Sequence, residues 1–373
     1  MNCFSCTLSN GLRLIHKPSP SPVAYCGIAV NAGTRDERPE ESGLAHFVEH
    51  LLFKGTDKRK AWHILNRMDC AGGELNAYTT KEETFVYAVF PDEHYERAVE
   101  LIADMVLHSR FPAKELEKER DVILDEILSY EDNPADLIFD EFENILFEGH
   151  PLGRHILGNR RSLSSFGTAS AQAFVERHYT AGNMVFFSMG NVAFKRIVRL
   201  AEKYLSEASP GHAPANGRQK PHPAPLCPQP RTVRKKTHQS HVLIGGWAYD
   251  MYDEKRAALF LLNNLLGGPG MNSRLNVSLR ERSGLAYNVE SGVTAYTDTG
   301  LYSIYFGTDP KNRERTVELV EKELRRLREE RLNDFRLAAA VKQAIGQLGV
   351  SGDHKESLFL GLGKSFLHFD RYE

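Results

Sequence analysis

Hydrophobic residues alternate with polar or small ones in several short stretches of the first half of the chain, which is the pattern of strands. We predict strands at residues 12–15, 25–30, 84–90 and 184–189. In other stretches apolar positions recur at helical spacing, and there we predict helices at residues 42–54, 94–107, 113–130 and 171–179. The first half therefore alternates strands and helices.

The second half repeats this order. A strand is predicted at residues 242–248, a helix at 254–266, a strand at 300–307 and helices from residue 312 onward. Such a repeat indicates an internal duplication at the level of element order. We therefore expect an α+β protein with two similar α/β-sandwich domains, each with a mixed, largely antiparallel sheet and helices on one side. The second domain lacks a counterpart of the strand at 184–189 before the sequence ends at Glu373.

The segment from about residue 207 to 231 is rich in Pro, Ala, Gly and His and has no apolar periodicity. Such a composition favours an extended connector. With 373 residues, the chain also has the usual length of two domains. We predict a first domain at residues 1–206, a linker at 207–232 and a second domain at 233–373.

The composition narrows the classes of function. Hydrophobic residues make up 41% and charged residues 26%, as in ordinary globular proteins. The formal net charge is −2, so no strong positive field would attract nucleic acid. The sequence shows neither a signal peptide nor an apolar stretch of membrane-spanning length, and we expect a cytoplasmic protein without a membrane partner.

The number and spacing of the cysteines are typical of a protein in a reducing compartment. Five of them, an odd number, are scattered along the chain and do not form a disulfide framework. Cys3 and Cys6 have the spacing of a metal or redox pair, but no second pair accompanies them. The sequence leaves their role open.

Residues 43–53 carry the first candidate chemistry. On a helix, His46 and His50 are one turn apart and project from the same face, where two imidazoles can bind one metal ion. Glu49 lies beside the second histidine and can reach a water on that metal. The pattern His46-x-x-Glu49-His50 therefore indicates zinc ligands together with a general base.

A catalytic zinc site needs a third protein ligand and leaves one position for water. The helix predicted at 113–130 offers two carboxylates, Glu119 and Glu126, which are seven residues apart and share a face. One of them can bind the metal while the other supports the site. The spacing alone does not say which.

Taken together, His46-x-x-Glu49-His50 and the later Glu126 resemble the insulinase and mitochondrial processing peptidase family, also called pitrilysin-like or inverzincin zinc peptidases. The chain is similar to bacterial processing-peptidase-like members. The resemblance implies one zinc ion per chain with Glu126 as third ligand. It also implies that Glu119 is the acid two turns earlier that supports the site.

The resemblance continues outside the metal motif. Residues 72–79 resemble the family segment that leads into a substrate-pairing edge strand, which implies that Asn76 and Ala77 bind substrate. Residues 267–275 and 279–287 also resemble the family, and Arg280 and Tyr287 match its substrate-binding pair. The resemblance thus implies two domains that face each other around a chamber.

We expect a metalloendopeptidase that hydrolyses peptides or unfolded segments with zinc-activated water. Glu49 would accept the proton of the water, Tyr287 would donate a hydrogen bond to the oxyanion and Arg280 would anchor the substrate. Two alternatives stay open, namely a non-catalytic scaffold or partner subunit of the same family, and a hydrolase of non-peptide amides. The chain could form a homodimer or pair with a related chain.

Overall fold

The structure is a computed structural model that describes residues 3–211, 218, 220–221 and 230–372. The chain divides into two compact units. Unit 1 contains residues 3–129, 154–211, 218 and 353–372, and unit 2 contains residues 130–153, 220–221 and 230–352. Residues 212–217, 219 and 222–229 of the expected linker lie outside the described part of the chain.

Unit 1 is built on a six-stranded sheet with the order β1-β2-β6-β3-β5-β4. Its strands are β1 (Phe4–Thr7), β2 (Arg13–Pro18), β3 (Val23–Val30), β4 (Glu74–Thr79), β5 (Thr84–Pro91) and β6 (Met184–Gly190). β2 and β6 are parallel, and the other neighbours are antiparallel. The prediction of a mixed, largely antiparallel sheet is therefore confirmed.

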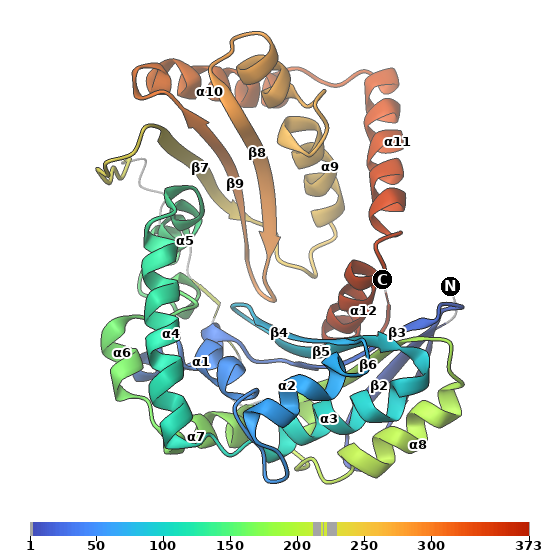
Figure 1. The fold of residues 1–373 in the computed structure, drawn as a ribbon. Helices are drawn as coiled ribbons and strands as arrows, with labels where there is room; N and C mark the ends of the chain where they lie inside the picture. The colour runs from blue at the N-terminus through green and yellow to red at the C-terminus, as the bar shows by residue number, and fades with distance from the viewer. Residues whose placement is uncertain (1–2, 212–217, 219, 222–229, 373) are drawn as a thin grey trace. The chain divides into compact units, whose positions relative to one another are not determined.

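One face of this sheet is covered by most helices of unit 1, several of which lie below the sheet in Figure 1. These helices are α1 (Leu44–Leu51), α2 (Ala61–Asp69), α3 (Tyr95–His108), α4 (Ala113–Glu131), α6 (Arg160–Ser165), α7 (Thr168–His178) and α8 (Phe194–Leu205). Alternate residues of the central strands, such as Cys26 and Ile28 of β3, are fully buried against them. This layer is the larger apolar core of the unit.

The opposite face is covered by α12 (Lys355–Phe369), which comes from the far end of the chain. Phe359 is fully buried, with its ring centroid 4.4 Å from that of Phe187 on β6 and 5.3 Å from that of Tyr25 on β3. Helices thus lie on both faces of the unit 1 sheet, not on one side as the periodicity suggested. The reason is that its strands carry apolar residues on both faces, so each face needs a cover.

Unit 2 has a three-stranded antiparallel sheet with the order β7-β9-β8 among the described residues. Its elements are α5 (Pro134–Leu146), β7 (Ser240–Ala248), α9 (Arg256–Gly267), a π-helical turn (Asn276–Glu281), β8 (Ala286–Ala295), β9 (Gly300–Thr308), α10 (Arg313–Glu329) and α11 (Asp334–Ser351). β7, β8 and β9 pair in the same order as β3, β4 and β5 of unit 1. The predicted repeat of element order is therefore confirmed.

The compact units differ from the expected contiguous domains in two segments. Residues 130–153, with α5, belong to unit 2, and residues 353–372, with α12, belong to unit 1. Local periodicity could not show this, because an apolar helix face does not say which sheet it covers. The periodicity also did not predict β1 (Phe4–Thr7), β8, α2, α5, α6 or α8 as elements.

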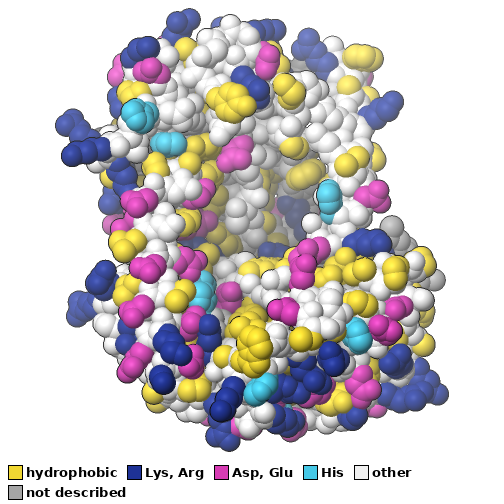
Figure 2. All heavy atoms as spheres, viewed as in Figure 1, with side chains coloured by type: hydrophobic (Ala, Val, Ile, Leu, Met, Phe, Trp, Pro, Cys, Tyr) yellow, Lys and Arg dark blue, Asp and Glu magenta, His cyan; other side chains and the backbone are white. Residues whose placement is uncertain are grey.

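The described residues contain no helix that combines the length and the apolar character needed to cross a lipid bilayer. Figure 2 shows acidic and basic side chains interspersed over the visible surface, in agreement with the balanced formal charge.

Candidate metal centre

The short helix α1 presents the two histidines of the motif. It begins after Gly43, whose φ of 92° lies in the left-handed region that favours glycine. A Cβ at Gly43 would also lie 2.7 Å from the Cα of Gly158, so the position has no room for a side chain. The helix spans Leu44–Leu51, shorter than the predicted 42–54 but long enough to hold both histidines on one face.

The start of α1 is capped by a buried carboxylate. Glu37 Oε1 accepts a hydrogen bond from the Ala45 backbone N–H at 2.8 Å, and its Oε2 accepts one from the Gly43 N–H at 3.0 Å. Burial raises the pKa of Glu37 to about 8, although both hydrogen bonds and the charge of Arg154 act in the opposite direction. The cap fixes the helix end next to His46.

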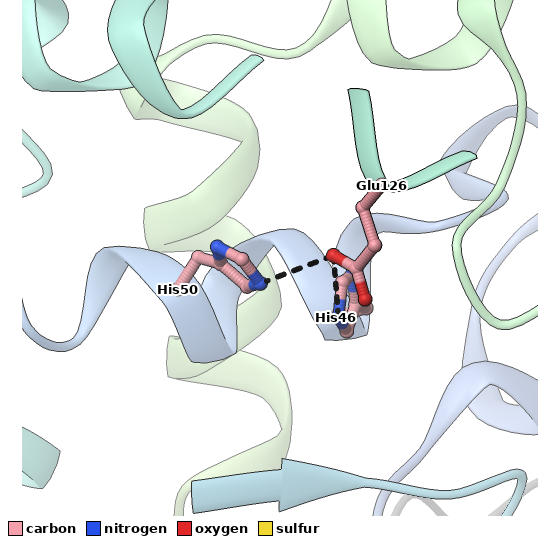
Figure 3. A group of neighbouring side chains, drawn as sticks. All are labelled: His46, His50 and Glu126. Atoms are coloured by element: carbon pink, nitrogen blue, oxygen red, sulfur yellow. Dashed lines mark ion pairs between the residues drawn. The ribbon is translucent and has the colours of Figure 1, made fainter. Parts of the chain in front are cut away.

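Glu126 on α4 reaches the same point as the two imidazoles (Figure 3). Its Oε2 lies 3.8 Å from His46 Nε2 and 3.7 Å from His50 Nε2. One ligand atom from each of the three residues lies within 4.8 Å of the other two. Among the described residues, this is the group of metal-binding side chains that the structure brings together.

The separations suit a zinc ion. Nitrogen and oxygen ligands bind zinc at about 2.0–2.2 Å, so two tetrahedral ligands are about 3.4 Å apart. The carboxylate–imidazole distances of 3.7 and 3.8 Å are close to this value. Two imidazole nitrogens and one carboxylate are also a donor set that zinc accepts while leaving a position for water. The residues therefore fit the expected metal.

His46 is kept in the form that binds metals. Burial, together with the charge of nearby His50, lowers its pKa to about 3. The ring is consequently neutral at pH 7, with a lone pair available to a cation. Its Nδ1 is buried and has no hydrogen-bond partner among the described residues.

Glu119 holds the second histidine. Its Oε2 lies 3.0 Å from His50 Nδ1, and its Oε1 lies 2.6 Å from Lys54 Nζ. Because Nδ1 is engaged by a carboxylate, the other ring nitrogen is directed to the metal position. The Glu119 side chain is 7% exposed, whereas the Glu126 side chain is 44% exposed and can meet a ligand from solvent. The two carboxylates that spacing alone could not separate thus have different surroundings.

Glu49 extends from α1, the helix of the two histidines, but is not one of the three clustered ligands. Burial raises the pKa of its carboxyl group, while hydrogen bonding to Thr79 and the charge of His50 lower it. Its Oε2 is buried without a hydrogen-bond partner in the described part of the chain. A carboxylate with an unsatisfied oxygen and a raised pKa has the properties of a general base.

β4 carries the expected substrate residues Asn76 and Ala77. It pairs only with β5 in the described sheet, opposite Tyr87 and Val86 respectively, so β4 is an edge strand. Both residues are partly exposed. The last residue of β4, Thr79, is the one that hydrogen-bonds Glu49, which connects this edge to the metal helix.

Arg280 and Tyr287 both lie in unit 2, on the π-helical turn and on β8. The structure brings the two side chains together: the Arg280 guanidinium carbon is 4.9 Å from the centre of the Tyr287 ring. Tyr287 is 73% exposed and therefore accessible to a ligand. A cation over an aromatic face is a favourable arrangement.

Three residues around the centre were missed by the sequence reading, namely Glu37, Lys54 and Thr79. Lys54 follows His50 by four positions, which could have indicated a neighbour on the helical face. Glu37 and Thr79 contact the helix from a preceding loop and from a strand, and nothing in their local sequence marks that contact.

The fold and the site define a class: a two-unit α+β protein with a candidate centre for a single metal ion on a His-x-x-Glu-His helix. Comparison with known proteins agrees. Residues 13–160 match the sequence model described as "Insulinase (Peptidase family M16)", and residues 165–344 match that of the "Peptidase M16 inactive domain".

Similar proteins come from several bacteria. An uncharacterized zinc protease of Bacillus subtilis is 33% identical over 98% of this chain and 88% of its own length. One from Streptomyces coelicolor is 35% identical over 97% of this chain and 80% of its own length. Among solved structures, a protease from Helicobacter pylori superposes with a TM-score of 0.89 at 21% identity, over 99% of this chain and 90% of the other. The chain belongs to the insulinase family, peptidase family M16.

Proposed function

We propose that this chain is a zinc-dependent metalloendopeptidase that hydrolyses peptides or unfolded polypeptide segments. The observation that carries the proposal is the convergence of His46 and His50 on α1 with Glu126 on α4, together with the Glu49 carboxyl group on α1. The proposal includes one zinc ion per chain and a cytoplasmic location.

His46, His50 and Glu126 would hold the metal. When bound, zinc supplies Lewis acidity, which lowers the pKa of a water molecule from about 15.7 towards 7 and polarises a carbonyl oxygen. Glu119 keeps His50 in the required orientation through the contact with Nδ1. The exposure of Glu126 leaves the metal position open to solvent and to a substrate.

Glu49 moves the protons. Its carboxylate takes a proton from the attacking water as the oxygen bonds to the scissile carbonyl carbon. The same carboxyl group then gives a proton to the amide nitrogen as the carbon–nitrogen bond breaks. The products are a new carboxyl terminus and a new amine, and Glu49 returns to its ionised form.

The outer edge of β4 would bind the substrate. An extended peptide can add to an exposed edge strand through main-chain hydrogen bonds, with side chains pointing alternately to the two faces. Asn76 and Ala77 lie on this strand, and Thr79 at its end contacts Glu49. Extended or unfolded segments can take this conformation, which a folded protein does not offer. Arg280 and Tyr287 are proposed to bind the same substrate.

The test combines metal analysis with cleavage of a mixed peptide library, with and without a chelator. The wild-type chain should contain about one zinc ion, and chelation should abolish cleavage. Glu49→Gln should keep the zinc and lower the turnover number by about 10²- to 10⁴-fold. Glu117→Gln on the exposed side of α4 serves as the matched control and should leave both unchanged.

Undiminished cleavage by Glu49→Gln would exclude Glu49 as the base. A chain that contains no zinc and cleaves nothing in the library would instead favour the scaffold or partner-subunit alternative.

A further inference from the structure

A second pocket lies in unit 1 between α2 and α3, on residues that the proposed peptidase chemistry does not use. It has a volume of about 240 Å³ and is lined by Arg59, His63, Asn66, Arg67, Cys70 and Arg97. Three of these six residues are arginines, and none is acidic. Figure 2 shows Lys and Arg side chains gathered over the part of the surface where α2 and α3 lie in Figure 1.

The pocket carries more positive than negative charge. Arg59 contacts Glu100 at 2.7 Å and Asp104 at 2.5 Å, and Arg67 contacts the same Glu100 at 2.9 Å. The carboxylates of Glu100 and Asp104 thus balance the charges of Arg59 and Arg67. Neither acidic residue lines the pocket itself. The third arginine, Arg97, forms no ion pair with any described residue and donates one hydrogen bond, to the Arg67 carbonyl oxygen at 3.3 Å.

Several donors on this wall have no acceptor. Arg97 uses Nη1 for the Arg67 carbonyl, which leaves its other guanidinium donors for a ligand. Arg67 uses Nη2 for Glu100, and its Nε is buried away from solvent, so this residue adds mainly charge to the wall. His63 is exposed beside them and adds a ring N–H. Such a set of planar, forked donors fits the oxygens of a phosphoryl group.

We propose that this pocket binds the phosphoryl group of a small soluble ligand, with Arg97 as its main contact. Its volume lies below the roughly 300–1,000 Å³ of pockets that enclose drug-sized molecules, so it suits one or two phosphoryl groups. Arg59 and Arg67 hold the wall in place through their carboxylate partners, and Arg97 supplies the charge that those partners do not balance. Binding at this pocket does not depend on the proposed peptidase function.

Cys70 provides a direct readout, because its exposed thiol lies in the pocket wall. The full chain is alkylated with iodoacetamide, and modification of Cys70 is followed by mass spectrometry of its peptide. Inorganic phosphate and pyrophosphate are titrated separately against sodium chloride at equal ionic strength. A probe at ten times its dissociation constant fills about nine-tenths of the sites, so alkylation of Cys70 should slow by up to about tenfold.

Three variants sharpen the test. Arg97→Gln should remove the protection, Arg97→Lys should retain part of it, and Arg161→Gln on the exposed side of α6 should leave it unchanged. Thermal unfolding without phosphate is measured for each variant. If Arg97→Gln is unfolded, His63→Gln replaces it and should weaken the protection.

Equal slowing by sodium chloride would overturn the proposal, because it would show general screening. Protection that is undiminished in folded Arg97→Gln would also overturn it. So would protection by vesicles of phosphatidylglycerol but not by either soluble probe, because the pocket would then recognise a lipid surface.

Discussion

Glu119 Oε2 lies 3.0 Å from His50 Nδ1, on the side of the imidazole ring opposite the nitrogen that faces Glu126. The same carboxyl group contacts Lys54 Nζ through its other oxygen. This contact fixes both the orientation of the ring and the nitrogen that carries the hydrogen. If the candidate centre binds zinc as proposed, its affinity would depend on Glu119, which is not itself one of the clustered ligands.

Glu119→Gln is therefore expected to weaken zinc binding by about 10- to 100-fold, as for other carboxylates that hydrogen-bond a metal-binding histidine. The amide can still accept from Nδ1–H but lacks the charge that makes the imidazole a stronger ligand. Competition with a chromophoric chelator measures the affinity. The control, Glu117→Gln, lies on the same helix and is exposed. An unchanged zinc affinity in Glu119→Gln would contradict the role.

Two glycines of α12 should respond in opposite directions to alanine. A Cβ at Gly363 would lie 2.7–2.9 Å from ring atoms of Phe187, so Gly363→Ala is expected to lower the free energy of unfolding by about 1–3 kcal/mol through overpacking. A Cβ at Gly361 meets nothing within 4 Å. Gly361→Ala should therefore stabilise the helix by up to about 1 kcal/mol.

Urea unfolding of both variants and of the wild type measures the two changes in the free energy of unfolding. Equal effects of the two substitutions would mean that α12 does not pack against β6 as described.

The attachment of α12 should weaken in acid. Burial by itself would raise the pKa of Glu83, but its hydrogen bond with His368 at 2.7 Å and the nearby charge of Lys364 lower it to about 2. The unfolded chain, with a carboxyl pKa near 4.5, then binds more protons than the folded chain between these values. The stability due to Glu83 is present above pH 4.5 and lost as the pH falls towards 2.

His368→Gln tests this contact. Because the Glu83 and His368 side chains are each only 3% exposed, the substitution should lower the free energy of unfolding at pH 7 by about 1–3 kcal/mol. The difference from the wild type should shrink as the pH falls from 4.5 towards 2, because the unfolded chain takes up a proton at Glu83 before the folded wild type does. His354→Gln, at the exposed start of α12, is the control. A difference that stays constant from pH 7 to pH 3 would argue against the ion pair.

Arg280→Gln and Tyr287→Phe should each lower kcat/KM for peptides while leaving zinc content and unfolding temperature unchanged. The Arg280 guanidinium lies against the exposed Tyr287 ring, and both offer hydrogen-bond donors to a substrate. Loss of one hydrogen-bond donor to the transition state should reduce kcat/KM by roughly 100- to 1,000-fold. Arg282→Gln, also exposed, controls for charge on the same segment. Wild-type kinetics in both variants would remove these residues from the substrate site.

The sequence alone was sufficient for the elements with strong periodicity and for the metal motif. The predicted helices at 94–107 and 113–130 correspond closely to α3 and α4. The predicted repeat also appears in the two sheets, whose strands pair in the equivalent orders β3-β5-β4 and β7-β9-β8. His46 and His50 could be paired because one helical turn fixes their separation whatever surrounds them. Glu126 joined them in the sequence only through the family resemblance.

Tertiary structure decided what lies beyond local geometry. The meeting of α1 and α4 gives Glu126 and Glu119 their different surroundings, and the packing of Phe359 on Phe187 brings the end of the chain onto the sheet of unit 1. Periodicity shows that a helix has an apolar face, but the surface that buries this face is chosen by shape and volume across the whole fold. For the same reason the arginines between α2 and α3, separated by up to 38 positions in sequence, become one pocket only when the helices pack.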